Sequence, residues 1–232
     1  MNDIAVSLLS GGLDSTTVLY YAIDQGYDIT AFTFDYGQRH SREIEASKLI
    51  AKKAGVKQKI FKIDIRQIGG SALTSNIAVP DHTDDGNIPV TYVPGRNIIF
   101  LSIAGSFAET IGSNKLFIGA NAIDYSGYPD CRPEFYASMV RTLSYGTKIG
   151  IEKGFDIKVP LQNMSKSEIV KLAVDLQAPI ELTASCYRGG KKACGKCDSC
   201  YIRLKGFADA GIPDRIEYEY YPDLVEERLS TF

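Results

Sequence analysis

The stretch SLLSGGLDSTTVLYY, residues 7–21, constrains the fold more than any other part of the chain. A short apolar run, IAVSLL, precedes two glycines and a helical pattern follows them, so the order is strand, tight turn, helix. Open α/β sheets bind ligands at such turns, at the carboxyl ends of their strands. The backbone amides, the hydroxyls of Ser10 and Ser15 and the helix N-terminus all favour an anion. We therefore predict a phosphate-binding loop at residues 10–15.

This loop carries a carboxylate where nucleotide loops often carry a lysine. It matches neither G-x-x-x-x-G-K-[ST] nor G-x-G-x-x-G, and neither pattern occurs elsewhere in the chain. The carboxylate of Asp14 would repel phosphate unless a divalent ion lay between them, and Mg²⁺ prefers such oxygen ligands. We predict that Asp14 holds Mg²⁺, directly or through water. The alternative role for Asp14 is to cap the helix.

Strand and helix patterns alternate along the rest of the chain. Apolar or β-branched runs predict strands at residues 4–9, 28–36, 57–64, 115–120 and 155–162. Helical spacing predicts helices at 15–26, 41–55, 97–112 and 165–177, the last with Ser165 and Glu168 in capping-box spacing. This order implies right-handed crossovers, so we predict an α/β fold with a doubly wound, mostly parallel, Rossmann-like sheet. Residues 65–94 predict a long functional loop or flap.

Four of the five cysteines are crowded in CYRGGKKACGKCDSC, a C-x7-C-x2-C-x2-C array formed by Cys186, Cys194, Cys197 and Cys200. Short C-x2-C turns direct two thiolates at one centre, and a structural zinc takes four ligands. We predict a closed zinc site, with a [4Fe–4S] cluster or redox-active thiols as alternatives. The expected domains are a nucleotide-binding domain at residues 1–182 and a small helical zinc lobe at residues 183–232. The fifth cysteine, Cys131, is either a packing residue or a chemical group.

Charge and hydropathy exclude several classes of function. A net charge of -2 and a pI near 5.8 give no general attraction for a nucleic-acid backbone, so a small-molecule substrate is favoured. The start, MNDIAVSLLS, has acidic Asp3 in place of a positive leader segment. No apolar run approaches the roughly 18 residues that a membrane span needs. We expect a cytoplasmic protein that makes no membrane contact.

The motif SGGLDS resembles the signature of the PP-loop ATP pyrophosphatase superfamily, and the alternative reading is an ordinary Gly-Ser turn. Members of that superfamily have an adenine nucleotide alpha hydrolase-like fold, transfer AMP to a substrate oxygen and release pyrophosphate. The resemblance implies catalytic roles for Asp14, Ser15 and Lys166. Lys166 is similar to the superfamily's phosphate-contacting lysine, and its alternative role is a solvated lysine in the first turn of a helix. The implied ATP-binding residues are Leu8, Leu9, Ser10, Gly11, Gly12, Leu13, Asp14, Ser15, Thr16, Thr17 and Val18.

Further segments narrow the resemblance. FDYGQRH, YVPGRN, GANAIDYSGYPDCRPEF and the four-cysteine array together resemble the 7-cyano-7-deazaguanine synthase family over essentially the whole chain. Members of that family convert 7-carboxy-7-deazaguanine to the nitrile with ATP and ammonia, on the path to queuosine. The resemblance implies an ATP-dependent carbon-nitrogen ligase that works through adenylated intermediates. It also implies ATP, Mg²⁺ and Zn²⁺ as cofactors, a homodimer, and no direct nucleic-acid partner.

Recognition of a deazaguanine carboxylate needs hydrogen-bond acceptors, planar surfaces and a cation. Two arginines could hold a carboxylate or phosphate bidentately. The candidate substrate-binding residues are Gln38, Arg96, Asn97, Asp124, Tyr128, Asp130 and Arg132. Because the sequence has no room for a glutaminase domain, we expect free ammonia or a partner to supply the nitrogen.

Two other functions remain open from the sequence. A tRNA-modifying enzyme of the same superfamily would need a basic surface and a reactive cysteine pair outside the metal set. A non-catalytic module would bind ATP as a regulatory ligand. Pyrophosphate release that depends on a substrate would distinguish an enzyme from such a module.

Overall fold

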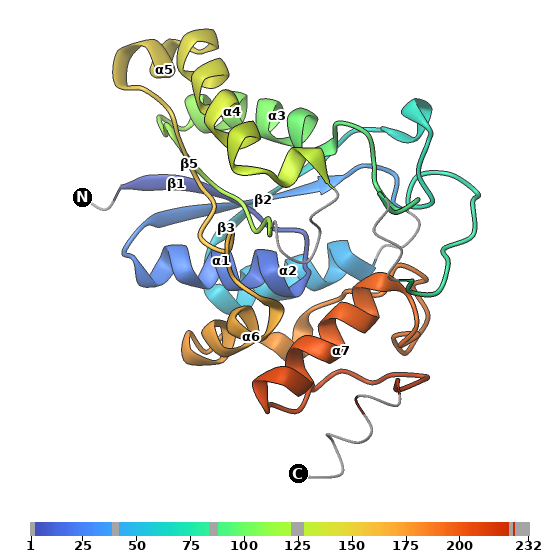
Figure 1. The fold of residues 1–232 in the computed structure, drawn as a ribbon. Coiled ribbons are helices and arrows are strands. Elements are labelled where there is room, and N and C mark those ends of the chain that lie inside the picture. The colour runs from blue at the N-terminus through green and yellow to red at the C-terminus, as the bar shows by residue number, and fades with distance from the viewer. Residues whose placement is uncertain (1–2, 39–41, 84–87, 122–127, 223–224, 226–232) are drawn as a thin grey trace.

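Five parallel strands form one sheet in the computed structural model, which describes residues 3–38, 42–83, 88–121, 128–222 and 225 (Figure 1). The strand order is β3-β2-β1-β4-β5, and each neighbouring pair is parallel. The order changes direction at β1, so a crevice opens at its carboxyl end. The strands are β1 (Ile4–Leu8), β2 (Asp28–Asp35), β3 (Lys57–Lys62), β4 (Lys115–Phe117) and β5 (Asp156–Lys158).

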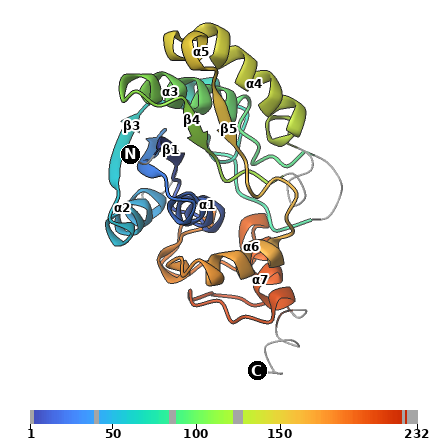
Figure 2. The ribbon, with the colours of Figure 1, turned by 90° about the vertical axis from the view of Figure 1, so that its left-hand side faces the viewer.

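Helices cover both faces of this sheet (Figure 2). One face carries α3 (Arg96–Thr110), α4 (Pro133–Gly146) and α5 (Lys148–Lys153), and the other carries α1 (Leu13–Asp24) and α2 (Arg42–Ala54). Beyond α1 lie α6 (Lys166–Asp175) and α7 (Asp198–Ala210). The doubly wound parallel sheet predicted from the sequence is confirmed.

Alternating residues of each strand supply the two cores. Val6 and Phe32 pack with Leu101 of α3 on one face. Ala5 packs with Val18 of α1 on the other. The central strands are therefore apolar on both sides, as expected for a parallel sheet covered by helices on both faces.

The predicted strands and helices all exist, with shifted ends. The first helix begins at Leu13 because Gly12, in extended backbone, is its N-cap. The capping box is confirmed: Ser165 Oγ accepts a hydrogen bond from the amide of Glu168, and the Glu168 carboxylate accepts one from the amide of Ser165. Helices α4 and α5 fall outside the predicted elements.

Helix α4 has a sequence signal that the prediction missed. Pro133 occupies its first turn, where the missing amide hydrogen costs nothing. Tyr136, Met139 and Leu143 follow at helical spacing, and all three are buried.

The loop predicted at residues 65–94 lies against the cysteine-rich lobe. Its described residues, 65–83 and 88–94, contain one regular element, the 3-10 turn η1 (Arg66–Ile68). Val79 packs in one apolar cluster with Cys197, and His82 stacks on Tyr201 with ring centroids 4.0 Å apart. The loop therefore bridges the sheet domain and the lobe.

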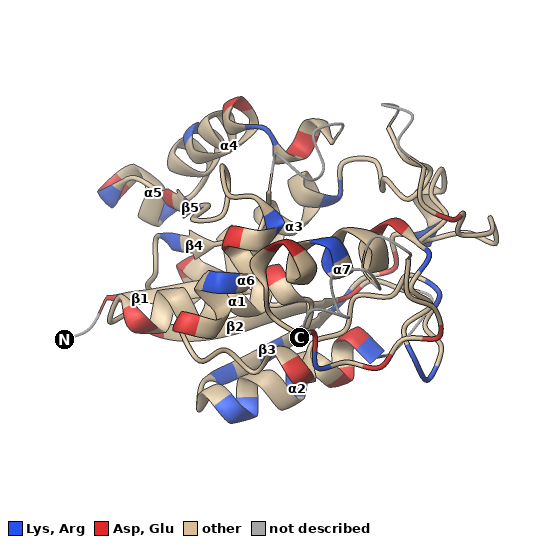
Figure 3. Ribbon diagram, turned by 60° about the horizontal axis from the view of Figure 1, so that its bottom comes forward, with Lys and Arg blue, Asp and Glu red and all other residues tan. Residues whose placement is uncertain are grey.

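The lobe is attached to the rest of the molecule through a buried arginine. Arg203 of α7 makes an ion pair with Asp214 at 2.7 Å, and both side chains are almost fully buried. Arg203 Nη2 also donates to the carbonyl of Ile180, outside the lobe, at 3.3 Å. Figure 3 shows acidic and basic residues side by side on α2, α6 and α7, in agreement with the small net charge. The domain boundary at residue 182 stays a prediction.

Candidate active site

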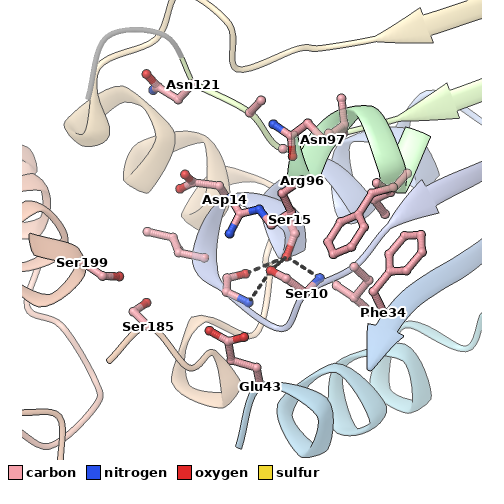
Figure 4. A pocket seen from close by; sticks show the side chains of 18 of the residues that line it. Ser10, Asp14, Ser15, Phe34, Glu43, Arg96, Asn97, Asn121, Ser185 and Ser199 are labelled. Carbon is pink, nitrogen blue, oxygen red and sulfur yellow. Dashed lines mark hydrogen bonds between the residues drawn. The ribbon is translucent and has the colours of Figure 1, made fainter. Parts of the chain in front are cut away.

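The phosphate loop folds back on itself at the carboxyl end of β1. The amide of Ser10 donates to Ser15 Oγ at 3.1 Å, and the two serine hydroxyls lie 2.9 Å apart. The amide of Gly12 donates to Ser10 Oγ at 3.2 Å (Figure 4). The sequence motif thus forms a compact turn at the N-terminus of α1, where amides and helix dipole favour an anion.

Close packing explains the glycine at position 11. Its φ is +91°, in the left-handed region, and a Cβ there would collide with backbone atoms of Glu43 and Ser47 in α2. The Gly11 carbonyl also accepts a hydrogen bond from the amide of Ala184 at 2.9 Å. The loop therefore packs between α2 and the segment that contains Ala184.

A second glycine, Gly119 after β4, contributes to the site without having been predicted. A Cβ at Gly119 would lie 2.8 Å from the amide nitrogen of Ser15. The end of β4 can therefore approach the N-terminus of α1 closely. Its sequence signal is a glycine directly after a predicted strand.

Asp14 and Lys166 form an ion pair across the loop. Lys166 Nζ lies 2.8 Å from each carboxylate oxygen of Asp14. Lys166 is only 8% exposed, so the alternative of a solvated lysine is wrong. The capping alternative for Asp14 is also not realised, because Gly12 is the N-cap of α1. The structure therefore joins two predicted catalytic residues in one charged pair.

A pocket of about 250 Å³ opens above this pair. Most of the predicted ATP and substrate residues line it, and they come from β1, α1, α3, α6 and connecting loops. Those predicted residues are Leu8, Leu9, Ser10, Gly12, Leu13, Asp14, Ser15, Gln38, Arg96, Asn97, Tyr128 and Lys166.

The remaining predicted residues lie elsewhere. Four of the predicted loop and helix residues are not part of the lining: Gly11, Thr16, Thr17 and Val18. Asp130 and Arg132 are also not part of it. Asp124 lies outside the described residues.

The side chain of Asp130 binds a backbone amide and does not line the pocket. Its carboxylate accepts a hydrogen bond from the amide of Asn97 at 3.0 Å, at the start of α3. The side-chain amide of Asn97 returns a hydrogen bond to the Asp130 carbonyl at 2.9 Å. Arg132 is exposed and is the N-cap residue of α4. The Asp130 carboxylate therefore positions Asn97, which does reach the pocket.

Aromatic rings form one wall of the pocket. The rings of Phe34 and Phe100 stack with their centroids 3.9 Å apart and an interplanar angle of 4°. The ring centroid of Tyr36 lies 5.4 Å from that of Phe100. All three line the pocket. A flat apolar wall of this kind suits a planar ring ligand.

Arg96 is the cation in the upper part of the pocket in Figure 4. Burial by itself would lower its pKa, but the surrounding Tyr36, Tyr187, Tyr128 and Asp130 outweigh burial and raise it. Arg96 is therefore a permanent positive charge that can pair with a carboxylate or a phosphate.

Glu43, in the first turn of α2, also lines the pocket and was not predicted. Burial raises the pKa of its carboxyl from 4.5 to about 7, and the nearby Arg96 opposes this shift only in part. The sequence offers no special signal for it, because an acid in the first turn of an amphipathic helix is usually solvated.

Cys131 lines the pocket as a neutral thiol. Burial, and after it the charge of Asp130, raises the pKa of Cys131 to about 11. A thiol of this kind is a poor nucleophile at neutral pH. Cys131 is the one cysteine outside the four-cysteine cluster, so the reactive pair that a sulfur-transferring enzyme would need is absent from the chain.

The four remaining cysteines meet in one cluster, and their Sγ atoms all lie within 4.8 Å of one another. A zinc ion with Zn–S distances of about 2.3 Å needs sulfurs about 3.8 Å apart. The Sγ atoms of Cys194 and Cys200 lie 3.9 Å apart. The amides of Lys196 and Cys197 each donate to Cys194 Sγ at 3.4 Å, as suits a thiolate. The residues therefore fit a four-thiolate metal site.

Gly195 makes the turn of this cluster possible. Its φ is +74°, and a Cβ there would collide with the backbone of Tyr220. The C-terminal strand-like segment thus packs directly on the metal-binding turn, with Ala193 and Tyr218 paired as a β-bridge.

Comparison with known proteins decides the family. Residues 4–211 match the family described as Queuosine biosynthesis protein QueC. The chain belongs to the QueC family. It is 58% identical over 228 residues to the 7-cyano-7-deazaguanine synthase of Thermoplasma volcanium, covering 97% of this chain and 95% of the relative. It is 59% identical over 230 residues to the enzyme of the same name from Picrophilus torridus, covering 98% and 96%.

The predicted function is confirmed at this level: the QueC family assignment and these relatives identify an ATP-dependent ligase of queuosine biosynthesis. Among solved structures, a predicted subunit of tRNA methyltransferase from Methanocaldococcus jannaschii superposes with a TM-score of 0.50 at 16% identity. The match covers 75% of each chain and shows the fold alone. Within the described parts of this QueC protein, no helix has the length and apolar character of a membrane span.

Proposed function

We propose that this QueC protein makes 7-cyano-7-deazaguanine by activating its substrate twice with ATP. The substrate carboxylate attacks the α-phosphorus of ATP, forming an acyl adenylate and releasing pyrophosphate. Ammonia then displaces AMP and gives the amide. The amide oxygen attacks the α-phosphorus of a second ATP and releases a second pyrophosphate, and loss of AMP and of both amide protons leaves the nitrile.

One observation carries the proposal: the phosphate loop, the Asp14–Lys166 pair and Arg96 all face one pocket with an aromatic wall. Anion-binding groups lie at its floor, and a planar apolar surface lies at its side. This reaction needs no protein nucleophile, because the substrate's own oxygen attacks. Catalysis then depends on positioning and on neutralising charge.

The pocket residues suit separate roles. The loop amides and the hydroxyls of Ser10 and Ser15 would hold the phosphates, with Lys166 as the cation for the pyrophosphate leaving group. Asp14 is the residue that would hold Mg²⁺, which supplies charge neutralisation at the phosphates. Arg96 would clamp the substrate carboxylate, and Phe34 and Phe100 would support a ring. Gln38, Asn97 and Tyr128 complete the proposed substrate set with Asp124, whereas Asp130 would act through Asn97 and the exposed Arg132 is not proposed to contact the substrate.

The four-cysteine cluster is proposed to hold structural Zn²⁺. Four thiolates leave no open position for a water or substrate, so the ion would stabilise the lobe without taking part in the reaction. The lobe matters to catalysis because Ser199 and Arg203 of α7 line the pocket.

We also propose a cytoplasmic homodimer that acts on small molecules without binding nucleic acid. Five cysteines without a disulfide suit a reducing compartment. A net charge of -2 gives no general attraction for RNA. The dimer follows from the family resemblance.

The test is mass spectrometry of a reaction that contains the metal-loaded protein, Mg²⁺-ATP, ammonium and 7-carboxy-7-deazaguanine. The expected result is a nitrile that requires both ATP and ammonium, together with AMP and pyrophosphate. No conversion by folded, metal-loaded protein would overturn the proposal. AMP without nitrile would mean a different acceptor.

A further inference from the structure

The side chain of Glu43 lies where two cavities meet. It lines the active-site pocket and also an adjoining outer cavity of about 480 Å³, which lies between α2 and residues 181–193. The outer cavity has acidic and basic residues in its wall, among them Glu45, Glu181 and Arg215. A small hydrated cation can therefore reach Glu43 from outside without crossing the phosphate loop.

Glu43 is the uncommitted carboxylate of the active-site pocket. The pocket has two carboxylates in its described lining, Asp14 and Glu43. Asp14 is neutralised by Lys166 at 2.8 Å. Among the described residues, none makes a hydrogen bond or an ion pair within 4 Å to the side-chain carboxylate of Glu43. Its charge is therefore available to a ligand.

Two ionisable groups on neighbouring elements face Glu43. Tyr36, at the end of β2, has its pKa raised to about 12 by burial and by the charge of Glu43, so it is neutral at pH 7. Arg96 is close enough to act electrostatically on Glu43 without pairing with it. In Figure 4 the Arg96 side chain lies above the Ser10–Ser15 loop and the Glu43 side chain below it, and both line the same pocket. An anion at Arg96 and a cation at Glu43 can therefore be bound together.

We propose that Glu43 binds the ammonium ion that enters through the outer cavity and accepts one of its protons, so that ammonia attacks the acyl carbon held beside Arg96. This inference rests on the proposed function. Ammonium at neutral pH has no lone pair for attack, so a base must remove a proton. The carboxylate becomes a carboxylic acid, the nitrogen forms the C–N bond as the bond to AMP breaks, and the second proton leaves the nitrogen for solvent.

The environment of Glu43 suits such a base. A proton acceptor works best when its pKa lies near the working pH, and burial moves the pKa of Glu43 toward 7. Its position in both cavities couples entry of the cation to its deprotonation. No other carboxylate in the described lining of the active-site pocket is available for this task.

The test compares ammonium with hydroxylamine, which is already neutral at pH 7, as the nucleophile. In Glu43→Gln, kcat/KM for ammonium should fall on the order of a hundredfold, as for loss of a general base. Hydroxamate formation with hydroxylamine should stay near the wild-type rate. Raising the pH should restore ammonium use in proportion to free ammonia, and Glu43→Asp should retain part of it.

The control is Glu152→Gln, an exposed acid of α5 that lines neither cavity. It should keep the wild-type KM for ammonium. Equal loss with both nucleophiles in Glu43→Gln would overturn the inference, because it would indicate a role in binding or structure. An unchanged kcat/KM for ammonium would overturn it too. Failure of the wild-type protein to release pyrophosphate with the carboxylate substrate would instead refute the proposed function.

Discussion

Lys166 Nζ donates to both carboxylate oxygens of Asp14, 152 positions earlier in the chain, at 2.8 Å. Asp14 belongs to the phosphate loop at the start of α1, and Lys166 is the first residue of α6. The capping box of Ser165 and Glu168 fixes the start of α6 directly beside it. The pair therefore balances the charge of the loop while it keeps a cation at the phosphate site.

Replacing Lys166 with methionine should abolish ATP-dependent pyrophosphate release and lower stability. Asp14 would keep a partly buried charge without its partner, which typically costs about 3–5 kcal/mol for a fully buried pair. Because Asp14 is 20% exposed, we expect the lower end of that range. Chemical denaturation measures the loss, and Lys171→Met, an exposed change on the same helix, is the control.

A second substitution distinguishes the effect of the Asp14–Lys166 pair on stability from its effect on activity. Adding Asp14→Asn to Lys166→Met should recover part of the lost stability, since the orphaned charge is gone, but no activity. Wild-type turnover in Lys166→Met would refute the role of the pair in catalysis.

The two loop glycines should respond differently to alanine. Gly11→Ala places a Cβ against the backbone of Glu43 at a φ of +91°, so we expect a loss of at least about 2 kcal/mol. Gly12 has a φ of -81°, and a Cβ there lies 3.4 Å from Ser10 Oγ, so Gly12→Ala should change stability by less than about 1 kcal/mol. Thermal unfolding of the two variants checks this, and equal losses would contradict it.

Metal removal should unfold the lobe that carries α7. Cys197→Ser is expected to lose zinc, because one of four thiolates is gone, and to lower the unfolding temperature. Native mass spectrometry should find one zinc per wild-type chain. Cys131→Ala, at a buried cysteine outside the cluster, should keep its zinc. Iron and acid-labile sulfide in the wild-type protein would instead indicate an iron–sulfur cluster.

Glu43 should make stability depend on pH. Its pKa is raised in the folded protein, from 4.5 to about 7, so the folded state binds more protons than the unfolded state between these values. Its contribution to stability is present below about pH 4.5 and is lost as the pH rises through about 7. Relative to Glu43→Gln, the wild-type protein should lose at most about 3 kcal/mol over this window. Solvent in the pocket reduces that figure, since Glu43 is only half-buried.

The measurement is the free energy of unfolding by denaturant at a series of pH values. The difference between wild type and Glu43→Gln should change with pH, whereas the difference between wild type and Glu45→Gln should stay flat. A flat Glu43→Gln difference would mean that the carboxyl titrates at its ordinary pKa in the folded protein.

The sequence by itself determined the features that depend on neighbours along the chain. The turn of SGGLDS, the parallel strands, the Ser165–Glu168 capping box and the four-cysteine array all arise from spacing over a few residues. Such local patterns act through backbone conformation and periodicity, so they can be identified before folding is known. The family resemblance rested on these same segments.

Only the tertiary structure decided which distant side chains meet. It paired Asp14 with Lys166, placed the unpredicted Glu43 in the pocket, and left Arg132 exposed outside it. In the folded protein, the Asp130 carboxylate accepts a hydrogen bond from the amide of Asn97. The physical reason is that charge pairing, burial and pKa depend on atoms that the crossovers of the sheet bring together. Residue types alone do not specify the distances between those atoms.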